Sequence, residues 1–417
     1  MSLQFITGNS GNGKTKYLFN RIVKEAKANP RDNYLVIVPE QFTMQTQRQL
    51  VDLSENKAIM NIDVLSFKRL AYRVFDELGI TNLTVLEETG KNLVLRKLAA
   101  QEADKLGIIG RNLNRIGYIS EVKSLLSELV QYNISPEELG RYIASGRLSD
   151  TLSDKLKDVL VLYEAFEKFM QDKYITAEEI LNVLCNVAEE SAILRNSVIA
   201  FDEFTGFTPI QNQLIKKLFV ISKKIYVTLT IDCREDIFKS RGMQELFDMP
   251  KRTVKSLTEM AAFYGIEVEE PIILDKNYRL AENEELSFME QQLFRKRRCS
   301  FKKVPKHIHI DCLRDPKQEL TKIARRINEL VRNENLRYRD IAIVTGDVNI
   351  YAGYVREIFD KYNIPYFIDA TQEILFHPFI EFIRSIPDIA AQNFSADAVF
   401  RFLRCGFSEL LDSEIDV

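Results

Sequence analysis

Short apolar runs alternate with amphipathic stretches through the first eighty or so residues of the chain. An apolar run predicts a buried strand, and apolar residues that recur every three or four positions predict a helix. We expect strands at Leu3–Thr7, Tyr34–Val38 and Ala58–Val64, and helices at Lys14–Lys27, Phe42–Leu53 and Ser66–Leu78. Strands that alternate with helices in this way indicate a parallel sheet with helices on its faces.

From Val85 to about Glu190 the pattern changes to long helical periodicity without a convincing strand. Strand patterns return at Ser197–Phe201 and Lys224–Ile231, and a helical stretch then continues to about Phe294. We therefore expect an all-helical insertion, with the first sheet completed by chain from both sides of it.

A second α/β unit is expected after Phe294. Its pattern predicts strands at His307–Cys312, Asp340–Thr345 and Tyr366–Ile368, and helices at Pro316–Val331 and Tyr351–Tyr362. The last helical residues run into LLDSEIDV with no cap or strand, so we expect the chain to end inside a domain. The expected organisation is residues 1–84 and 193–294 for the first α/β domain, 85–192 for the insertion and 295–417 for a truncated second domain.

The stretch Arg295–Lys306 (RKRRCSFKKVPK) holds seven basic residues in twelve. It fits a solvated linker between domains, and it also fits a strip that contacts phosphates. No internal repeat is visible along the chain.

The composition, with 46% hydrophobic and 28% charged residues, is typical of a soluble globular protein. No apolar run is long enough to span a membrane and no signal peptide is recognisable, so we expect a cytoplasmic protein. The five cysteines form no C-x-x-C pair, which favours reduced structural thiols. The net charge of -3 means that any contact with nucleic acid would be local.

The segment Gly8–Thr15 (GNSGNGKT) fits the pattern G-x-x-x-x-G-K-[S/T] between a predicted strand and a predicted helix. Glycines at Gly8, Gly11 and Gly13 would let backbone N–H groups converge on phosphate oxygens at the start of the helix. Lys14 would reach the β and γ phosphates, and the Thr15 hydroxyl would bind magnesium. The alternative, an accidental glycine-rich turn, does not explain the strand–loop–helix context.

An acidic pair, Asp202 and Glu203, follows the predicted strand in VIAFDEF. In a P-loop ATPase the first acid would hold magnesium and the second would orient or deprotonate the attacking water. Adjacent acids after an apolar run are common, so this interpretation depends on the glycine-rich loop.

Beyond these motifs, the chain resembles the helicase-like half of the AddB/RexB subunit of bacterial ATP-dependent helicase–nucleases, which is itself similar to UvrD-type superfamily 1 helicases. The resemblance covers essentially all 417 residues and is carried by segments such as GNSGNGKTKYLFNRIV, YLVIVPEQFTMQTQRQL and FDEFTGFTPIQNQLIKKL. It implies a RecA-like P-loop domain and the start of a second RecA-like domain.

The resemblance also implies roles for individual residues. Lys14 and Thr15 match the nucleotide-binding pair, and Asp202 and Glu203 match the two acids of the magnesium motif. Asn277, Tyr278 and Arg279 resemble the helicase NYR box, in which the arginine senses the γ-phosphate; the alternative is an exposed arginine at the start of a helix. Four residues occupy positions where such helicases contact single-stranded DNA, with core packing as the alternative for the two phenylalanines: Phe42, Thr43, Ser66 and Phe67.

The chain also departs from the helicase pattern. Phe204 and Thr205 stand where motor helicases have Gln-Asp, and Glu235 stands where a glutamine is expected. These departures put coupled ATP hydrolysis in doubt. The later helicase motifs and the C-terminal nuclease domain, with its cysteine-ligated iron–sulfur cluster, would follow Val417.

His307, His309 and Asp311 alternate along a predicted strand and could imitate a metal site. Alternating polar residues are also what the solvated face of a half-buried strand requires, so we interpret these three as structural. His377 stands alone.

The resemblance implies an ATP- and magnesium-binding component of a DNA helicase/exonuclease that processes double-strand ends for recombination. It further implies a heterodimer with an AddA-type partner and recognition of a hotspot sequence in DNA. One alternative is a DNA-recognition scaffold that keeps the P-loop as a relic and does not hydrolyse ATP. Another is a small-molecule P-loop kinase, for which Arg111 and Arg115 are the candidate lid residues.

Overall fold

The computed structural model describes residues 1–81, 84–108, 117–145, 148–170, 174–176, 178–295, 299–369, 374 and 376–407. The chain divides into two compact units, Met1–His307 and Ile308–Val417. Among the described helices, none has the length and apolar character needed to cross a lipid bilayer. The candidate lid residues Arg111 and Arg115 and the terminal segment Leu410–Val417 lie outside the described residues.

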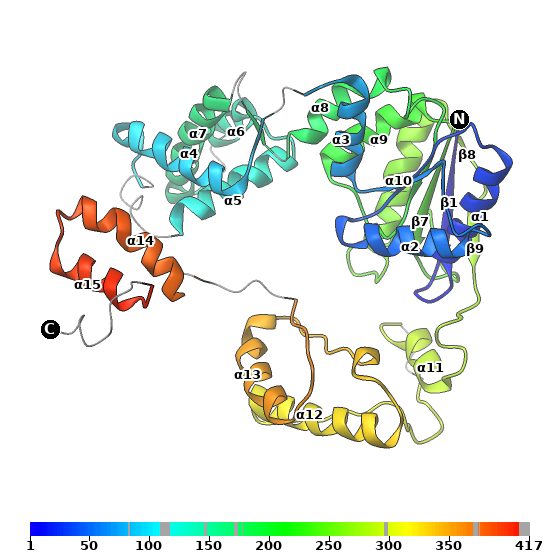
Figure 1. Cartoon of the computed structure of the whole chain (residues 1–417). Coiled ribbons are helices and arrows are strands. Elements are labelled where there is room, and N and C mark those ends of the chain that lie inside the picture. Colours follow the sequence, from blue (N-terminus) through cyan, green and yellow to red (C-terminus); the bar gives the residue numbers. More distant parts are fainter. Residues whose placement is uncertain are drawn as a thin grey trace. The chain divides into compact units, whose positions relative to one another are not determined.

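A seven-stranded sheet forms the centre of the first unit, and its described pairings are all parallel (Figure 1). Its strands are β1 (Ser2–Gly8), β2 (Tyr34–Ile37), β3 (Ile62–Leu65), β6 (Val198–Phe201), β7 (Lys224–Thr230), β8 (Glu267–Val268) and β9 (Ile272–Leu274). They lie in the order β3-β2-β6-β7-β1-β8, and β9 also pairs with β1. The expected parallel sheet, completed by chain that follows the insertion, is confirmed.

Helices cover both faces of this sheet because its strands alternate their apolar side chains between the two faces. Leu35, Ile37 and Phe201 pack with α3 (Phe67–Leu78), α8 (Ile180–Val187), α9 (Pro209–Ile221) and α10 (Asp248–Phe263). Tyr34 and Val36 pack on the opposite face with α1 (Lys14–Ala28) and α2 (Thr43–Leu53), which follows the single turn η1 (Glu40–Phe42).

The described elements between the two halves of the sheet are mostly helices, and they have a hydrophobic core of their own. The helices are α4 (Glu88–Gln101), α5 (Tyr118–Gln131), α6 (Pro136–Ala144) and α7 (Asp150–Met170), with the single turn η2 (Ala103–Lys105). Two short strands that the pattern did not predict, β4 (Val85–Leu86) and β5 (Ile175–Thr176), pair where the chain enters and leaves. Helix α8 and the turn η4 (Ala188–Glu190) contribute to the core of the sheet domain.

The sequence interpretation was wrong at one edge of the sheet. The stretch up to Phe294 was expected to be helical, but β8 and β9 lie within it and both pair with β1. Strands of two and three residues give too few alternations to be recognised by periodicity. Helix α11 (Glu284–Gln292) follows them.

In the second unit the described elements are helical: α12 (Pro316–Asn333), the single turn η5 (Tyr338–Asp340), α13 (Val348–Lys361), α14 (Pro378–Ala391) and α15 (Ala396–Arg404). The strands predicted at His307–Cys312, Asp340–Thr345 and Tyr366–Ile368 are wrong for the described residues, because none of them makes a ladder with a neighbouring segment. Ile310, Val344 and Phe367 are 94%, 93% and 88% exposed. Alternating sequence does not make a strand unless a second strand accepts its hydrogen bonds.

Candidate nucleotide site

The glycine-rich loop joins the end of β1 to the start of α1. Gly11 and Gly13 have φ angles of 90° and 79°, which side chains other than glycine rarely adopt. Within the described part of the chain, the backbone N–H groups of Gly13, Lys14 and Thr15 donate to no protein acceptor. These N–H groups stand at a helix N-terminus, where they are suited to bind an anion.

Two of the glycines also permit the end of β9 and the segment that follows it to approach the loop. A Cβ at Gly8 would lie 2.6 Å from the carbonyl oxygen of Leu274, and a Cβ at Gly11 would lie 2.8 Å from the Cβ of Arg279. The Tyr278 N–H donates to the Gly11 carbonyl at 3.0 Å. The NYR segment predicted from sequence therefore lies directly against the glycine-rich loop.

Lys14 folds back on the loop that precedes it. Its Nζ atom donates to the carbonyl oxygens of Gly8 at 3.0 Å and Asn9 at 3.1 Å. Burial lowers the pKa of the Lys14 ammonium, the carboxylates of the acidic pair oppose this, and Arg279 adds to the lowering. The ammonium is therefore held beside the loop by backbone dipoles.

The acidic pair follows β6 and meets the start of α1. The Thr15 hydroxyl oxygen lies 3.3 Å from Oδ1 of Asp202 and 3.2 Å from Oε1 of Glu203, so the two carboxylates share it. Asp202 is 1% exposed, and its Oδ1 also accepts a hydrogen bond from the Thr228 hydroxyl on β7. Thr228 was not predicted from the sequence, since a threonine in a buried strand carries no motif.

The surroundings of Asp202 fit a cation. Burial is the main cause that raises the pKa of Asp202 to about 6, and the negative charge of Glu203 raises it further. Among the described residues, its Oδ2 atom is buried and has no hydrogen-bond partner. A buried carboxylate oxygen without a donor is costly, and a bound magnesium ion with its water shell would satisfy it.

These groups face one open pocket of about 820 Å³. Lys14, Thr15, Asp202, Glu203 and Arg279 all line it, so the structure brings the predicted nucleotide residues together. Arg279 reaches the loop, where its Nη1 lies 3.3 Å from the Ser10 hydroxyl. The opposite wall is a polar face of α2.

Three of the predicted DNA-contacting residues occupy structural positions or the pocket wall. Phe42 is half-buried at the rim of the pocket and packs on the core beneath α2. Thr43 is 3% exposed and donates to the Glu40 carbonyl at 3.0 Å. Ser66 caps α3 by accepting from the Arg69 N–H, and its hydroxyl donates to the Glu40 carboxylate.

Phe67, the fourth, belongs to an aromatic cluster. Its ring centroid lies 5.8 Å from that of Phe201 and 5.6 Å from that of Phe204, and the side chain is 7% exposed. Core packing, the alternative weighed for this residue, therefore describes its surroundings. Contact between these four residues and DNA stays a prediction.

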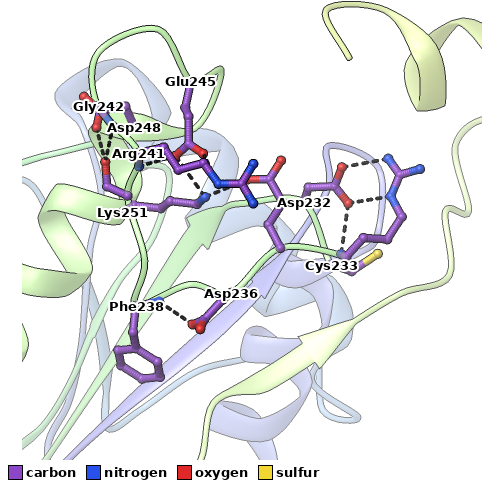
Figure 2. Close-up of polar contacts among 12 residues, drawn as sticks. Asp232, Cys233, Asp236, Phe238, Arg241, Gly242, Glu245, Asp248 and Lys251 are labelled. Carbon is purple, nitrogen blue, oxygen red and sulfur yellow. Dashed lines mark hydrogen bonds and ion pairs between the residues drawn. The ribbon is translucent and has the colours of Figure 1, made fainter. Parts of the chain in front are cut away.

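The residues that depart from the helicase pattern are engaged within the protein. Phe204 belongs to the same aromatic cluster. Glu235 forms an ion pair at 2.7 Å with the Nζ of Lys251, which is 3% exposed and also pairs with Glu245 at 3.2 Å. Figure 2 shows the segment from Asp232 to Lys251 that these pairs hold together.

Among the described residues, no group of three or more His, Cys, Asp or Glu side chains is placed to hold a metal ion, and this includes His307, His309 and Asp311. The His307 N–H donates to the Glu285 carboxylate, and Asp311 pairs with Lys322. Two residues of the basic stretch also have partners, since Arg295 pairs with Asp232 at 2.5 Å and Lys303 pairs with Glu284. Residues 296–298 of that stretch lie outside the described residues.

The fold and the site define a class of protein: a parallel α/β domain with a glycine-rich strand-to-helix loop after β1 and, close to it, an acidic pair at the end of β6, which is separated from β1 by β7 alone. Within this class the chain belongs to the family described as ADDB, N-terminal, whose model matches residues 5–290.

Known relatives extend over the whole chain. It is 38% identical over 422 residues to the B subunit of the ATP-dependent helicase/deoxyribonuclease of Lachnoclostridium phytofermentans, covering 100% of this chain and 37% of that protein. It is 33% identical over 426 residues to the protein of the same name from Clostridium tetani, covering 100% and 36%. The chain thus spans a little over a third of the length of these relatives.

Proposed function

We propose that this chain binds magnesium ATP as the helicase-like part of a helicase–nuclease subunit that processes double-strand DNA ends for recombination. The observation that carries the proposal is the convergence of Lys14, Thr15, Asp202 and Glu203 on one pocket, with the Thr15 hydroxyl 3.3 and 3.2 Å from the two carboxylates. Two sequence segments that lie far apart in the chain supply these groups, and their chemistry matches the needs of a metal-bound triphosphate.

Each residue has a role in this proposal. Free N–H groups of the loop bind phosphate oxygens, and Lys14 leaves the Gly8 and Asn9 carbonyls to reach the outer phosphates. Thr15 and Asp202 would hold magnesium, which would supply positive charge beside the phosphates. Glu203 orients the attacking water, and Arg279 senses the γ-phosphate from the NYR segment.

Turnover by this chain is expected to be slow. Phe204 and Thr205 replace polar residues that motor helicases use, and Glu235 is held in an ion pair by Lys251 and does not line the pocket among the described residues. The same observation favours the second candidate, a DNA-recognition scaffold that binds without hydrolysis. The relatives named as helicase/deoxyribonuclease subunits support a role in a complex, for which we propose DNA and an AddA-type subunit as partners, and a hotspot sequence as the DNA that is recognised.

Equilibrium binding of a fluorescent ATP analogue tests the nucleotide site. Lys14→Ala removes a charge-assisted contact worth about 1.5–3 kcal/mol, so the analogue should bind roughly 10- to 100-fold more weakly. Lys24→Ala, at an exposed position of the same helix, is the matched control and should leave the affinity unchanged. Equal affinity of the wild type and Lys14→Ala would overturn the assignment.

Gel-shift titration with single-stranded DNA distinguishes the two candidate functions. Affinity that changes when magnesium ATP is added supports a nucleotide-responsive helicase-like protein. Affinity that falls steeply with salt yet is indifferent to ATP supports the scaffold.

A further inference from the structure

The second residue of the glycine-rich loop, Asn9, is tied to two distant segments. Its side-chain Oδ1 accepts from the Cys233 N–H at 2.9 Å, and its Nδ2 donates to Oε1 of Glu290 on α11 at 2.5 Å. Asn9 is 5% exposed. A buried amide needs both a donor and an acceptor, and these two contacts satisfy both ends of it.

Asn9 contacts the segment Asp232–Phe238, which follows β7, and the first residue of this segment is anchored by several hydrogen bonds. Asp232 is 1% exposed, and its carboxylate accepts from the Arg234 Nη2 at 2.7 Å and the Arg295 Nη2 at 2.5 Å. The Arg234 N–H donates to the same carboxylate at 3.0 Å. Further along, Glu235 forms the ion pair with Lys251 described above, so the segment Asp232–Phe238 is held at two points.

Asn9 also contacts the Lys14 ammonium, which binds phosphate in the proposed function. Its backbone carbonyl accepts from the Lys14 Nζ at 3.1 Å and from the Asn12 N–H at 3.2 Å. When Lys14 turns toward a phosphate, that carbonyl loses its charged donor. The peptide that carries the Asn9 side chain is then free to adjust, and the side chain transmits the adjustment to Cys233 and Glu290.

We propose that Asn9 is a positioning residue of the nucleotide site, which sets the glycine-rich loop against the segment Asp232–Phe238 and transmits nucleotide occupancy to that segment. This inference rests on the proposed nucleotide binding and deepens it. Hydrogen bonds join Lys14 to Asn9 and Asn9 to the Cys233 N–H, which belongs to the peptide that follows the buried Asp232. Such a path needs an element with two arrangements, and the contact of the Lys14 ammonium with the Asn9 carbonyl is the one that a bound phosphate would replace.

The chain has no tryptophan, so a single Phe238→Trp substitution gives a unique fluorescent reporter. Phe238 is 47% exposed, and its N–H donates to Asp236 at 3.0 Å within the segment (Figure 2). The reporter is used after its melting temperature and its affinity for the ATP analogue are shown to equal those of the wild type. Binding of magnesium ATP analogue, measured separately by calorimetry, should change its emission.

In the reporter background, Asn9→Ala should weaken analogue binding about tenfold and abolish the emission change at saturating analogue. Asn9→Asp alone places a carboxylate against Glu290 and should behave in the same way. Combining Asn9→Asp with Glu290→Gln reverses donor and acceptor while keeping one negative charge in the pair, and should restore affinity to within about threefold together with the emission change. Asn61→Ala is the matched control for stability, because that amide donates to three backbone carbonyls away from the loop.

The outcomes separate the two claims. Analogue binding without any emission change, or an emission change that survives Asn9→Ala, would overturn the role of Asn9 and leave the nucleotide site standing. Failure of the paired substitution to restore the response, while its melting temperature recovers, would reduce Asn9 to a structural residue. If calorimetry detects no analogue binding to the wild type, both the nucleotide site and this inference fall.

Discussion

Replacing Asp202 by asparagine should make the nucleotide-free chain more stable while removing its metal ligand. The Asp202 carboxylate is buried, one of its oxygens has no partner among the described residues, and its pKa is raised from 3.8 to about 6. A raised pKa in an acid means that the charged form is disfavoured in the folded state. An uncharged side chain of the same shape avoids that cost.

The magnitude follows from the shift. At about 1.4 kcal/mol for each pH unit, a rise from 3.8 to about 6 costs roughly 3 kcal/mol at neutral pH. The asparagine Nδ2 would be buried without an acceptor, which offsets about 1–2 kcal/mol of this. The net gain is about 1–2 kcal/mol, or roughly 2–4 °C in melting temperature.

The pH dependence gives the sharper test. Below pH 3.8 the aspartate is protonated in both the folded and unfolded states and costs nothing, and between pH 3.8 and about 6 its cost grows as only the unfolded state loses the proton. Thermal melts across this range should therefore show the advantage of Asp202→Asn shrinking as the pH falls from 6.5 toward 4. A variant that is less stable than the wild type at pH 7.5, or a difference that does not change with pH, would refute the reasoning.

The same melts probe function. A saturating ligand at a hundred times its dissociation constant stabilises a protein by about 2.7 kcal/mol. Magnesium ATP analogue should raise the melting temperature of the wild type, and the magnesium-dependent part of that rise should vanish in Asp202→Asn. Metal binding would then explain why the chain has a buried aspartate at position 202 although its charge lowers the free energy of unfolding.

Three other substitutions have defined outcomes. Gly11→Ala should lower the unfolding free energy by about 1–3 kcal/mol and weaken analogue binding, because the added Cβ would collide with the NYR segment. In the same denaturant titration Gly79→Ala should cost only about 1 kcal/mol, because no described atom lies within 4 Å of the added Cβ. Lys251→Met leaves two glutamates without their shared buried partner and should cost about 3–5 kcal/mol, while Lys255→Met on the exposed side of the same helix should change stability by less than about 0.5 kcal/mol. Phe67→Ala should destabilise by about 3–5 kcal/mol through loss of the aromatic cluster, and a variant of unchanged stability that binds single-stranded DNA more weakly would show instead that this ring contacts DNA.

The sequence was sufficient for the strands that lie in the middle of the sheet and for the groups at their ends. The run YLVIV is apolar over its whole length because both faces of the sheet are covered. In KIYVTLTI the residues Ile225–Leu229 are buried and all but Thr228 are apolar or aromatic. Parallel strands also place their carboxyl ends on one edge of the sheet, so Lys14, Thr15 and Asp202 lie at the same edge once β1 and β6 are recognised as parallel strands.

Elements that depend on distant partners could not be predicted in this way. β8 and β9 are defined by pairing with β1, some 260 residues earlier, rather than by their own pattern. The contacts of Asn9 and Thr228 carry no motif, since an asparagine in a loop and a threonine in a strand are ordinary. The predicted strands of the second unit failed for the converse reason, because their alternation is present and a pairing partner is not found among the described residues.

The order of strands in the sheet constrains how the chain can fold during synthesis. The partners of β1 are β7, β8 and β9. β1 ends at Gly8, and it cannot pair until β7, which begins at Lys224, has been synthesised. At about 5–20 residues per second, a ribosome needs roughly 10–40 s to make the intervening chain. During that interval both edges of β1 lack a hydrogen-bonding partner. The helical insertion has a core of its own, so it can fold first and bring the two halves of the sheet closer together. Nascent chains stalled before Lys224 should therefore be strong clients of holding chaperones, and chains released after Leu274 should not.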